Sequence, residues 1–338
     1  MGTSGIGAVG NPVTNIGELQ TKGWGITINT VNVDNKKLRW ETSLNLSAFK
    51  TNIEKFYSDA AFVDRISWWM DNWTQRSAVG EAPWLFRGYI ADGLFQSLED
   101  IANSPVRVDN NGARLPANAT TGVWVGDIKY KDINGDNKID FRDETNIGNP
   151  WPKLFGGLTN SFSYKGFDLS ILVTGTFGQD IYNHIRKVNS KTSTIYTSRN
   201  LLVDALDYAR ITMKNGSPVL ENPNTNVPRF TNSQVGNDNN YNTTSTMWVE
   251  DGSFVRVKNI SLSYNVPNSL IGKQKIVKSI RATIGAQNLL TFTDYKGFDP
   301  EVGSYVGANS NSGNQAIGLD YGRYPLTPVY NFTLNVNF

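Results

Sequence analysis

The sequence predicts an all-β protein, an antiparallel transmembrane β-barrel segment with long extracellular loops. Three observations predict this fold class: a strictly alternating terminal strand, further alternating segments joined by tight turns, and the overall composition. The chain has 31 Gly, 13 Pro and 12% aromatic residues but only 18% charged residues, a balance that favours strands and turns. No run of 18 apolar residues occurs, which excludes a transmembrane helix, whereas a spanning strand needs only about 9 to 11 residues.

The terminal strand, residues 330–338, alternates without error between apolar and small polar residues. Because successive side chains in a strand point to opposite faces, one face is wholly apolar and the other is polar but uncharged. The apolar face consists of Tyr330, Phe332, Leu334, Val336 and Phe338. This pattern is expected where lipid lies on one side of a strand and a wet lumen on the other.

Other segments repeat the alternation and predict about eight strands in all. A first hairpin joins residues 24–28 to 38–47, and a second joins 158–164 to 167–177 through the tight turn Lys165-Gly166. Further strands are predicted at residues 254–264, 279–292 and 329–338. In the first of these, the apolar phase shifts near Lys258-Asn259, which predicts a β-bulge.

The predicted connections are of very unequal length. Four of them are too long for an ordinary compact domain, at residues 50–83, 93–150, 178–250 and 293–325. Outer-membrane barrels alternate short periplasmic turns with long extracellular loops, so this imbalance fits the barrel. Within the third loop, Asn200 is predicted to cap a helix over residues 201–209. Residues 216–240, rich in Asn, Pro and Gly, are expected to be irregular.

Charge and composition argue against several function classes. The 32 basic and 30 acidic residues are interspersed and give a net charge of +2, which offers no field for nucleic acid. The chain contains no cysteine, which removes disulfides, thiolate chemistry and cysteine-based zinc sites. His184 is the single histidine and no G-x-S-x-G motif occurs, so we expect an ordinary loop histidine and no enzyme. The G-x-G-x-x-G match at residues 5–10 lacks the flanking strand and helix of a dinucleotide site and is expected to be a flexible loop.

A candidate calcium loop lies within residues 127–144. Its oxygen-bearing side chains follow the spacing of an EF-hand loop, with position 7 offering its backbone carbonyl. The candidate ligands are Asp132, Asn134, Asp136, Lys138, Asp140 and Asp143. The loop departs from the EF-hand pattern at Asn137, which replaces the usual Gly, and at Asp143, which replaces a bidentate Glu. A solvated turn that binds nothing is the alternative, and any Ca²⁺ here is expected to be structural.

A group of aromatic residues in the first long loop is a candidate substrate-binding platform. Its members are Trp68, Trp69 and Trp73. Aromatic ring faces stack on the apolar faces of sugars and exclude water, which suits capture of a sugar or peptide. The alternative is that these rings pack the loop itself or belong to an aromatic belt at the membrane surface.

Seven phrases occur in a fixed order along the chain. They are GDIKYKDINGD at 126–136, IGNPWPK at 147–153, SYKGFDLS at 163–170, WVEDGSFVRVKNISL at 248–262, AQNL at 286–289, DYKGFDPE at 294–301 and YPL at 324–326. Together with the terminal strand, they resemble the C-terminal barrel portion of SusC/RagA-like TonB-linked outer-membrane proteins. The resemblance covers residues from about 20 to 338.

The resemblance implies a barrel of about 22 strands with a plugged lumen, in the outer membrane of a Gram-negative, Bacteroidetes-type cell. It also implies import of oligosaccharides or peptides together with a SusD-like surface lipoprotein, with energy supplied through TonB. The sequence departs from the family in having no signal peptide, TonB-contacting segment or plug domain. We therefore expect residues 1–338 to be the C-terminal part of the barrel, and the remaining N-terminal barrel and plug part to come from a second polypeptide or a longer parent.

Two other function classes are compatible with the residues. A soluble all-β carbohydrate-binding protein with a structural calcium site would also show alternating strands. A glycosidase would need two close carboxylates in a cleft, and nothing in the sequence singles out such a pair among the 30 acidic residues.

Overall fold

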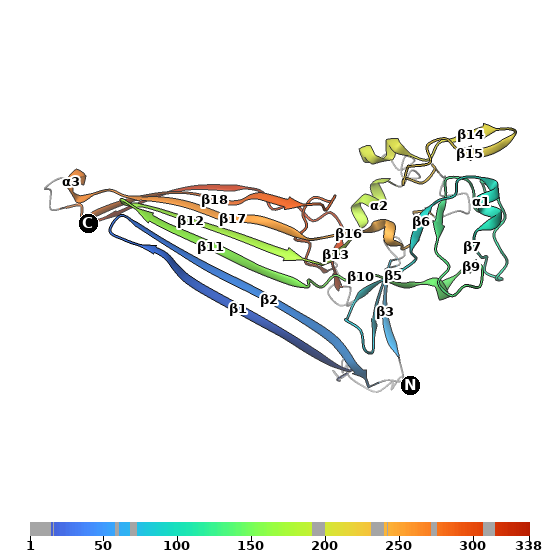
Figure 1. Ribbon diagram of the computed structural model, residues 1–338, viewed down its shortest axis with the longest axis horizontal. Coiled ribbons are helices and arrows are strands. Elements are labelled where there is room, and N and C mark those ends of the chain that lie inside the picture. The colour runs from blue at the N-terminus through green and yellow to red at the C-terminus, as the bar shows by residue number, and fades with distance from the viewer. Residues whose placement is uncertain are drawn as a thin grey trace, which may run out of the picture.

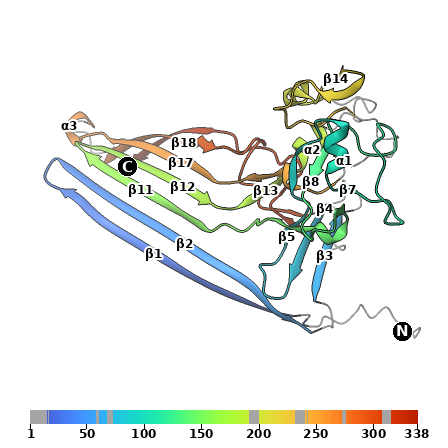
Figure 2. The same ribbon diagram turned by 45° about the vertical axis from the view of Figure 1, so that its right-hand side comes forward.

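The computed structural model describes residues 15, 17–57, 61–67, 73–190, 200–230, 240–241, 243–271, 276–306 and 315–338. A long, twisted antiparallel sheet, called the wall below, makes up most of the length of the molecule (Figure 1). Smaller sheets and short helices gather at one end of the wall and form the head (Figure 2). Two tight turns and the connection at residues 266–278 lie at the other end, and the three longest connections between wall strands are on the side of the head.

The wall contains seven strands in the order β1-β2-β11-β12-β17-β18-β22. Their bounds are β1 Gly17–Asp34, β2 Leu38–Phe56, β11 Leu154–Tyr164, β12 Phe167–Phe177, β17 Phe254–Asn265, β18 Ser279–Thr293 and β22 Val329–Asn337. Neighbouring strands are antiparallel throughout. About eight strands were expected, and the sheet has seven; it is open in this structure, with β1 and β22 at its edges.

The two predicted hairpins are confirmed. β1 and β2 extend at the head end beyond the predicted segments, to 18 and 19 residues. The β11–β12 hairpin turns at Lys165 and Gly166, which have φ of 47° and 86°. Two successive positive φ values are those of a type I′ turn, whose twist matches that of the flanking strands. This turn sets the register in which Tyr164 pairs with Phe167.

The bulge predicted near Lys258 is confirmed. The β17–β18 register shifts between Val257, which pairs with Leu290, and Asn259, which pairs with Gln287. The β12–β17 register shifts at the same place. A bulge inserts an unpaired residue and changes the face on which later side chains lie. For this reason both Val257 and Ile260 lie on the apolar face, although they are three positions apart and an odd spacing in a regular strand puts side chains on opposite faces.

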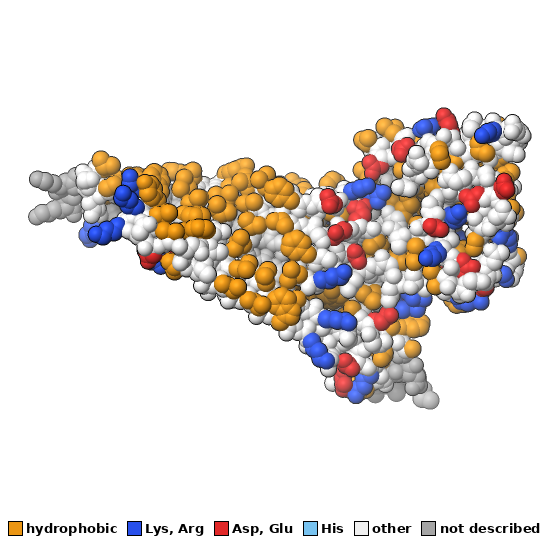
Figure 3. Space-filling model, viewed as in Figure 1, with side chains coloured by type: hydrophobic (Ala, Val, Ile, Leu, Met, Phe, Trp, Pro, Cys, Tyr) orange, Lys and Arg blue, Asp and Glu red, His pale blue; other side chains and the backbone are white. Residues whose placement is uncertain are grey.

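The apolar face of the wall is not covered by any other part of the described chain. Phe332 is 69% exposed, Ile284 is 56% exposed and Leu334 is 55% exposed. A continuous hydrophobic surface follows the wall and ends at the head, where charged side chains begin (Figure 3). Large contiguous apolar surfaces of this kind mark a contact with a membrane or with other protein.

Aromatic residues border this apolar face near both ends of the strands. At the end with the tight turns, Trp40 stacks on Phe162 at 5.5 Å between ring centroids. At the head end, Trp24 lies opposite Ala48 and is 51% exposed. Eight strand residues separate Ala48 from Trp40 along β2, or about 27 Å at 3.4 Å per residue. In a strand tilted by about 40°, as in outer-membrane barrels, this length spans about 21 Å across the membrane, comparable to the apolar band of about 25 Å between the aromatic girdles.

The head contains short strands and helices from the long connections. Between β2 and β11 lie β3 Phe62–Ser67, β4 Trp73–Ala78, β5 Leu85–Gly88, β6 Ala91–Leu94, α1 Leu98–Asn103, β7 Val106–Arg107, β8 Ile128–Tyr130, β9 Lys138–Ile139, η1 Phe141–Asp143 and β10 Thr145–Gly148. Between β12 and β17 lie β13 Asp180–Asn183, α2 His184–Ser190, η3 Val203–Asp207, β14 Ile211–Lys214, β15 Ser217–Leu220, η4 Thr246–Trp248 and β16 Val249–Asp251. Between β18 and β22 lie β19 Ser304–Val306, β20 Gln315–Ile317 and β21 Leu319–Asp320. The remaining helix, α3 Asn268–Ile271, lies at the opposite end of the wall, between β17 and β18.

The buried core is in the head. One cluster includes Val125, Ile128 and Phe95, and a second includes Phe86 and Trp248. Apolar burial in these clusters, worth about 25 cal/mol per Å², stabilises connections that have little regular structure. The exposed apolar side chains of the wall have no such core.

A buried carboxylate organises the segment between these clusters. Asp127 is 0% exposed and accepts hydrogen bonds from Arg229 Nε at 2.6 Å and Asn240 Nδ2 at 2.8 Å. Its other oxygen accepts the backbone N–H of Trp124 at 2.7 Å. Because a buried charge is tolerated only when it is paired and hydrogen-bonded, Asp127 requires residues more than 100 positions away in the chain. It thereby joins two of the long connections.

One expectation for the third connection is wrong and another is wrong in part. The helix predicted over residues 201–209 is only the short 3₁₀ turn η3, in which Val203 and Leu206 are exposed and Ala205 alone is buried. In the region predicted to be irregular, residues 217–220 form β15, which pairs with β14 in a regular hairpin, whereas residues 221–230 have no helix or strand. It turns at Asn215 and Gly216, both with positive φ.

Several smaller expectations can also be placed. His184 begins α2 and is buried against Tyr321, with ring centroids 4.6 Å apart, so it is not a loop histidine. The glycine motif at residues 5–10 lies outside the described residues. Among the helices of the described chain, none has the length and apolar character needed to cross a membrane.

Candidate functional site

The second face of the wall is polar and carries the candidate site. The register places small polar side chains from every wall strand on this face. Among them are Thr27, Asn45, Ser43, Thr159, Thr174, Ser261, Thr283, Asn331 and Thr333. Ser263 and Thr283 share a hydrogen bond of 2.8 Å across this face. Uncharged donors and acceptors of this kind suit transient contacts with sugar hydroxyls or peptide groups.

Where this polar face meets the head, it forms a cavity of about 300 Å³, called the mouth cavity below. Phe49 and Phe254 line it from the wall, and Trp151 and Glu301 line it from the connections. The rings of Phe49 and Trp151 meet edge to face at 6.1 Å, and Trp151 Nε1 donates to the Pro83 carbonyl at 2.7 Å. The aromatic surface is therefore held in a fixed orientation. The lining of the mouth cavity combines apolar rings with two carboxylates, those of Asp180 and Glu301.

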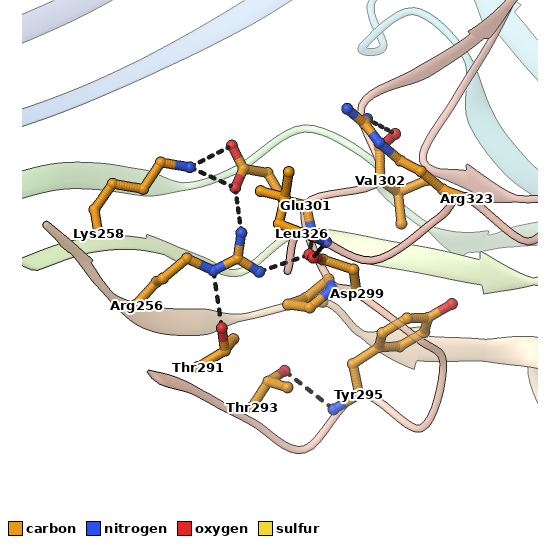
Figure 4. Close-up of polar contacts among 12 residues, drawn as sticks. Arg256, Lys258, Thr291, Thr293, Tyr295, Asp299, Glu301, Val302, Arg323 and Leu326 are labelled. Carbon is orange, nitrogen blue, oxygen red and sulfur yellow. Dashed lines mark hydrogen bonds and ion pairs between the residues drawn. The ribbon is translucent and has the colours of Figure 1, made fainter. Parts of the chain in front are cut away.

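A network of ion pairs fixes one side of the mouth cavity (Figure 4). Arg256 on β17 is 1% exposed and donates to Asp299 and to Glu301, each at 2.7 Å. Its Nε donates to Thr291 Oγ1 at 2.8 Å. Lys258, at the bulge, donates to the same Glu301 carboxylate at 3.1 Å. The bulge therefore brings a second cation to Glu301, which lines the mouth cavity, and the network ties the connection after β18 to the wall.

Asp299 is the buried acceptor of this network. It accepts the backbone N–H groups of Glu301 and Leu326, both at 2.9 Å, as well as the Arg256 guanidinium. Burial alone raises the pKa of this carboxyl, but the two backbone donors and Arg256 outweigh burial, so the pKa lies below its ordinary value of 3.8. Asp299 is therefore ionised at neutral pH. Glu301, whose side chain is 43% exposed, is the member of the network that reaches solvent.

The structure does not test the aromatic residues predicted to bind substrate. Trp68 and Trp69 lie outside the described residues, and Trp73 begins β4. Their role in binding stays a prediction. Sequence reasoning missed Phe49, Trp151 and Glu301, which lie in segments 100 or more residues apart. The sequence phrases at 147–153 and 294–301 could have indicated Trp151 and Glu301, because each phrase contains a residue that lines the mouth cavity.

The candidate calcium loop lies in the head and is held by its own hydrogen bonds. Asp132 accepts the N–H groups of Gly135 and Asn137 at 2.7 Å, and Asp143 accepts those of Ile133 and Asp140. These contacts make a compact turn and leave Asp143 buried.

A neighbouring guanidinium occupies part of the candidate ligand set. Arg142 bridges Asp136 and Asp140, each at 2.7 Å. In the described part of the chain, no three His, Cys, Asp or Glu side chains are placed to hold a metal ion. Calcium binding by this loop stays a prediction, and it requires Arg142 to move away.

If Ca²⁺ displaces Arg142, the Arg142→Gln variant should bind the ion more tightly than the unaltered chain, whose affinity should lie in the range of about 10⁻⁴ to 10⁻³ M. Titration of purified protein with Ca²⁺, followed by calorimetry, measures both. Arg39→Gln, which removes a guanidinium from an unrelated pair with Glu41, is the matched control and should change nothing. A flat titration for both the unaltered chain and Arg142→Gln excludes the site.

The two acceptors of Arg256 should differ strongly in their effect on stability. Asp299→Asn leaves a buried guanidinium without its buried counter-ion and should lower the free energy of unfolding by about 3 kcal/mol. Glu301→Gln removes the exposed partner of the same guanidinium and should cost less than about 1 kcal/mol. Urea unfolding followed by tryptophan fluorescence compares the two variants. Equal losses would show that Asp299 has no special role.

The stabilising effect of Asp299 should also depend on pH. Because its pKa is lowered in the folded state, its contribution is fully present above the unfolded value of about 3.8 and is lost as pH falls through the folded value. The stability difference between the unaltered chain and Asp299→Asn should therefore shrink between about pH 5 and pH 2. Unfolding curves at several pH values measure this. A difference that stays constant to the lowest pH would contradict the assignment.

Comparison with known proteins identifies relatives along the whole chain. The chain is 33% identical over 332 residues to TonB-dependent receptor P3 of Formosa agariphila, a match that covers 98% of this chain and 30% of the relative. It is 24% identical over 307 residues to TonB-dependent receptor SusC of Bacteroides thetaiotaomicron, covering 87% of this chain and 25% of SusC. No family model matches the chain. The chain thus spans about 30% or less of the length of these relatives.

A solved structure supports the same relationship at the level of the fold. The structure of the RagAB peptide transporter aligns with 96% of this chain and 30% of the matched chain, with a TM-score of 0.67 and 21% sequence identity. The open state of the RagAB peptide importer aligns with a TM-score of 0.64. The long antiparallel wall and the head are therefore part of a known architecture. The chain is homologous, along essentially its full length, to about 30% of a TonB-dependent receptor of the SusC/RagA type.

Proposed function

We propose that this chain forms part of the barrel wall of a SusC-like TonB-dependent transporter, which imports oligosaccharides or peptides across the outer membrane of a Bacteroidetes-type cell. The observation that carries the proposal is the two-faced wall: one face is apolar, exposed and bordered by aromatic residues, and the opposite face is polar. Homology to TonB-dependent receptors supports the proposal that this surface belongs to a transporter.

The exposed apolar face favours this reading over a soluble carbohydrate-binding protein. A soluble sandwich buries its apolar face against a second sheet, whereas Phe332 and Ile284 are more than half exposed. Polar groups on the apolar face are paired internally: Asn160 accepts hydrogen bonds from Trp40 Nε1 at 3.0 Å and Thr42 Oγ1 at 2.7 Å. A polar side chain that faces hydrocarbon must be hydrogen-bonded to other protein groups, because leaving it unpaired there costs free energy.

The two edges of the wall support completion by further strands. β1 and β22 each pair on one side only among the described strands. In a bilayer, each unpaired backbone group costs several kcal/mol, so an open sheet edge is not stable there. We propose that strands of the remaining N-terminal barrel part pair with these edges and complete a barrel of about 22 strands. The plug and the contact with TonB would belong to that part.

The partner and the solute are proposed from the same relationship. A SusD-like surface lipoprotein would lie over the head, as the second protein implied by the RagAB assembly. The solute would pass the mouth cavity, where Phe49 and Trp151 offer ring faces and Glu301 offers an acceptor. TonB-dependent transporters are not enzymes, and this supports the expectation that the chain catalyses no reaction.

A pair of neighbouring substitutions tests the membrane orientation. Leu334→Lys places a charge on the apolar face in the middle of β22, where it should cost about 2 to 4 kcal/mol in lipid and reduce the amount of assembled protein. Thr333→Lys places the same charge on the polar face of the same strand and should be tolerated. Outer-membrane fractionation and heat-modifiable gel mobility measure assembly.

Equal assembly of the two variants would contradict the orientation. Recovery of the chain without detergent as a monodisperse monomer would refute the transporter and favour the soluble carbohydrate-binding protein.

A further inference from the structure

A second cavity, of about 560 Å³ and called the seam cavity below, lies where the wall opens beside β2. β11 follows β2 only as far as Ser47, which pairs with Phe155. Further along β2, Ile53 bonds instead to the backbone of Gly80 and Glu81. Between these two attachments, residues 48–51 line the seam cavity on one side and residues 149–153 line the other.

Three lysines and two tryptophans line the seam cavity. They are Lys22, Lys50, Lys153, Trp24 and Trp151. No aspartate or glutamate is among its lining residues. The three lysine side chains are exposed, and none of them takes part in the ion pairs found among the described residues. Lys55 and Lys129, by contrast, each have a carboxylate within 3.1 Å.

The strand register places two of these cations on the apolar face. Lys22 pairs with Lys50, and the next pair on the same face is Trp24 with Ala48, followed by Ile26 with Leu46. The lysines therefore lie one step beyond the aromatic border of the hydrophobic surface. Figure 3 shows basic side chains in a line at this boundary, between the hydrophobic surface and the head. The cations are thus at the depth of lipid headgroups, on the outer side of the membrane.

We infer that the seam cavity binds the phosphorylated headgroup of an outer-leaflet lipid, with Lys22, Lys50 and Lys153 holding the phosphate. The inference rests on the proposed membrane location of the wall. Like-charged lysines that lie opposite each other on neighbouring strands destabilise the pair, and an anion between them removes that repulsion. The Trp24 ring, at the upper border of the apolar band, is placed to contact the acyl region below the phosphate.

The charge and shape of the seam cavity favour a lipid over the transported solute. Lys22, Lys50 and Trp24 lie on the apolar face, whereas Phe49 and Phe254 of the mouth cavity lie on the polar face. Phe49 and Trp151 line both cavities, so the two cavities adjoin. The exposed lining of the seam cavity is mainly apolar, so its occupant combines an anionic group with a hydrocarbon part. A phosphorylated glycolipid or phospholipid has both.

The test measures binding of lipid A and of dephosphorylated lipid A to the purified transporter in detergent, by native mass spectrometry. The unaltered protein should bind lipid A and should bind the dephosphorylated form much more weakly. The triple variant Lys22→Gln, Lys50→Gln, Lys153→Gln should lose affinity for lipid A by roughly a hundredfold, from about fivefold for each lysine near an anionic surface.

Two further variants control for folding and for charge. Lys36→Gln, Lys37→Gln, Lys165→Gln removes the same charge from the tight turns at the opposite end of the wall and should bind as the unaltered protein does. Replacing the three seam lysines by arginine keeps the charge and should keep the binding. Millimolar inorganic phosphate should not displace the lipid, because a free ion lacks the hydrocarbon contact.

Equal affinity of the seam and turn variants for lipid A would overturn the inference, and so would equal binding of the dephosphorylated lipid. Displacement by inorganic phosphate would assign the lysines to a free anion and would also overturn it. If lipid binding fails while the protein still assembles in the outer membrane with heat-modifiable mobility, the inference alone is wrong. If the unaltered protein does not assemble in the membrane, the proposed function is wrong.

Discussion

The structure depends on the pairing of backbone groups between long antiparallel strands, because the wall has no apolar core beneath its hydrophobic face. Each wall strand is fixed by ladders to its neighbours, and the period of two then separates apolar from polar side chains. In soluble sheets, side-chain burial adds stability to such ladders. Here the equivalent burial is in the head, around Ile128 and Trp248, so the two parts of the chain obtain their stability from different sources.

The sequence predicted the wall almost completely because the wall obeys a local rule. Alternation located its strands, Lys165-Gly166 marked a hairpin, and the phase shift at Lys258 located a bulge that the register confirms. The predicted ends of β1 and β2 were wrong because both strands continue into segments where polar residues lie on both faces. In such segments the sequence no longer shows the contrast between an apolar and a polar face. The Asn215-Gly216 hairpin was missed although Asn-Gly is a strong turn signal, because it was read as part of a generally polar loop.

The head and the mouth cavity could not be predicted, because they depend on contacts between distant parts of the chain. The burial of Asp127 is explained only by its hydrogen bonds with Arg229 and Asn240. The burial of Arg256 is explained only by its ion pairs with Asp299 and Glu301. No local period connects such partners. The family phrases indicated which segments matter, without saying what they contact. In the candidate calcium loop, a local sequence pattern is present but does not decide the function. The residues whose spacing fits a metal loop also form a turn that is closed by hydrogen bonds and by Arg142.

The bulge at Lys258 has a consequence for how proteins of this kind diverge. One added residue in a regular strand moves every later side chain of that strand to the opposite face. In β17, Lys258 is left out of the pairing with both neighbouring strands, so the later residues keep their faces. An insertion or deletion in the wall therefore needs a compensating irregularity in the same strand. In the head, a change of length is limited instead by buried contacts such as those of Asp127 and Asp299.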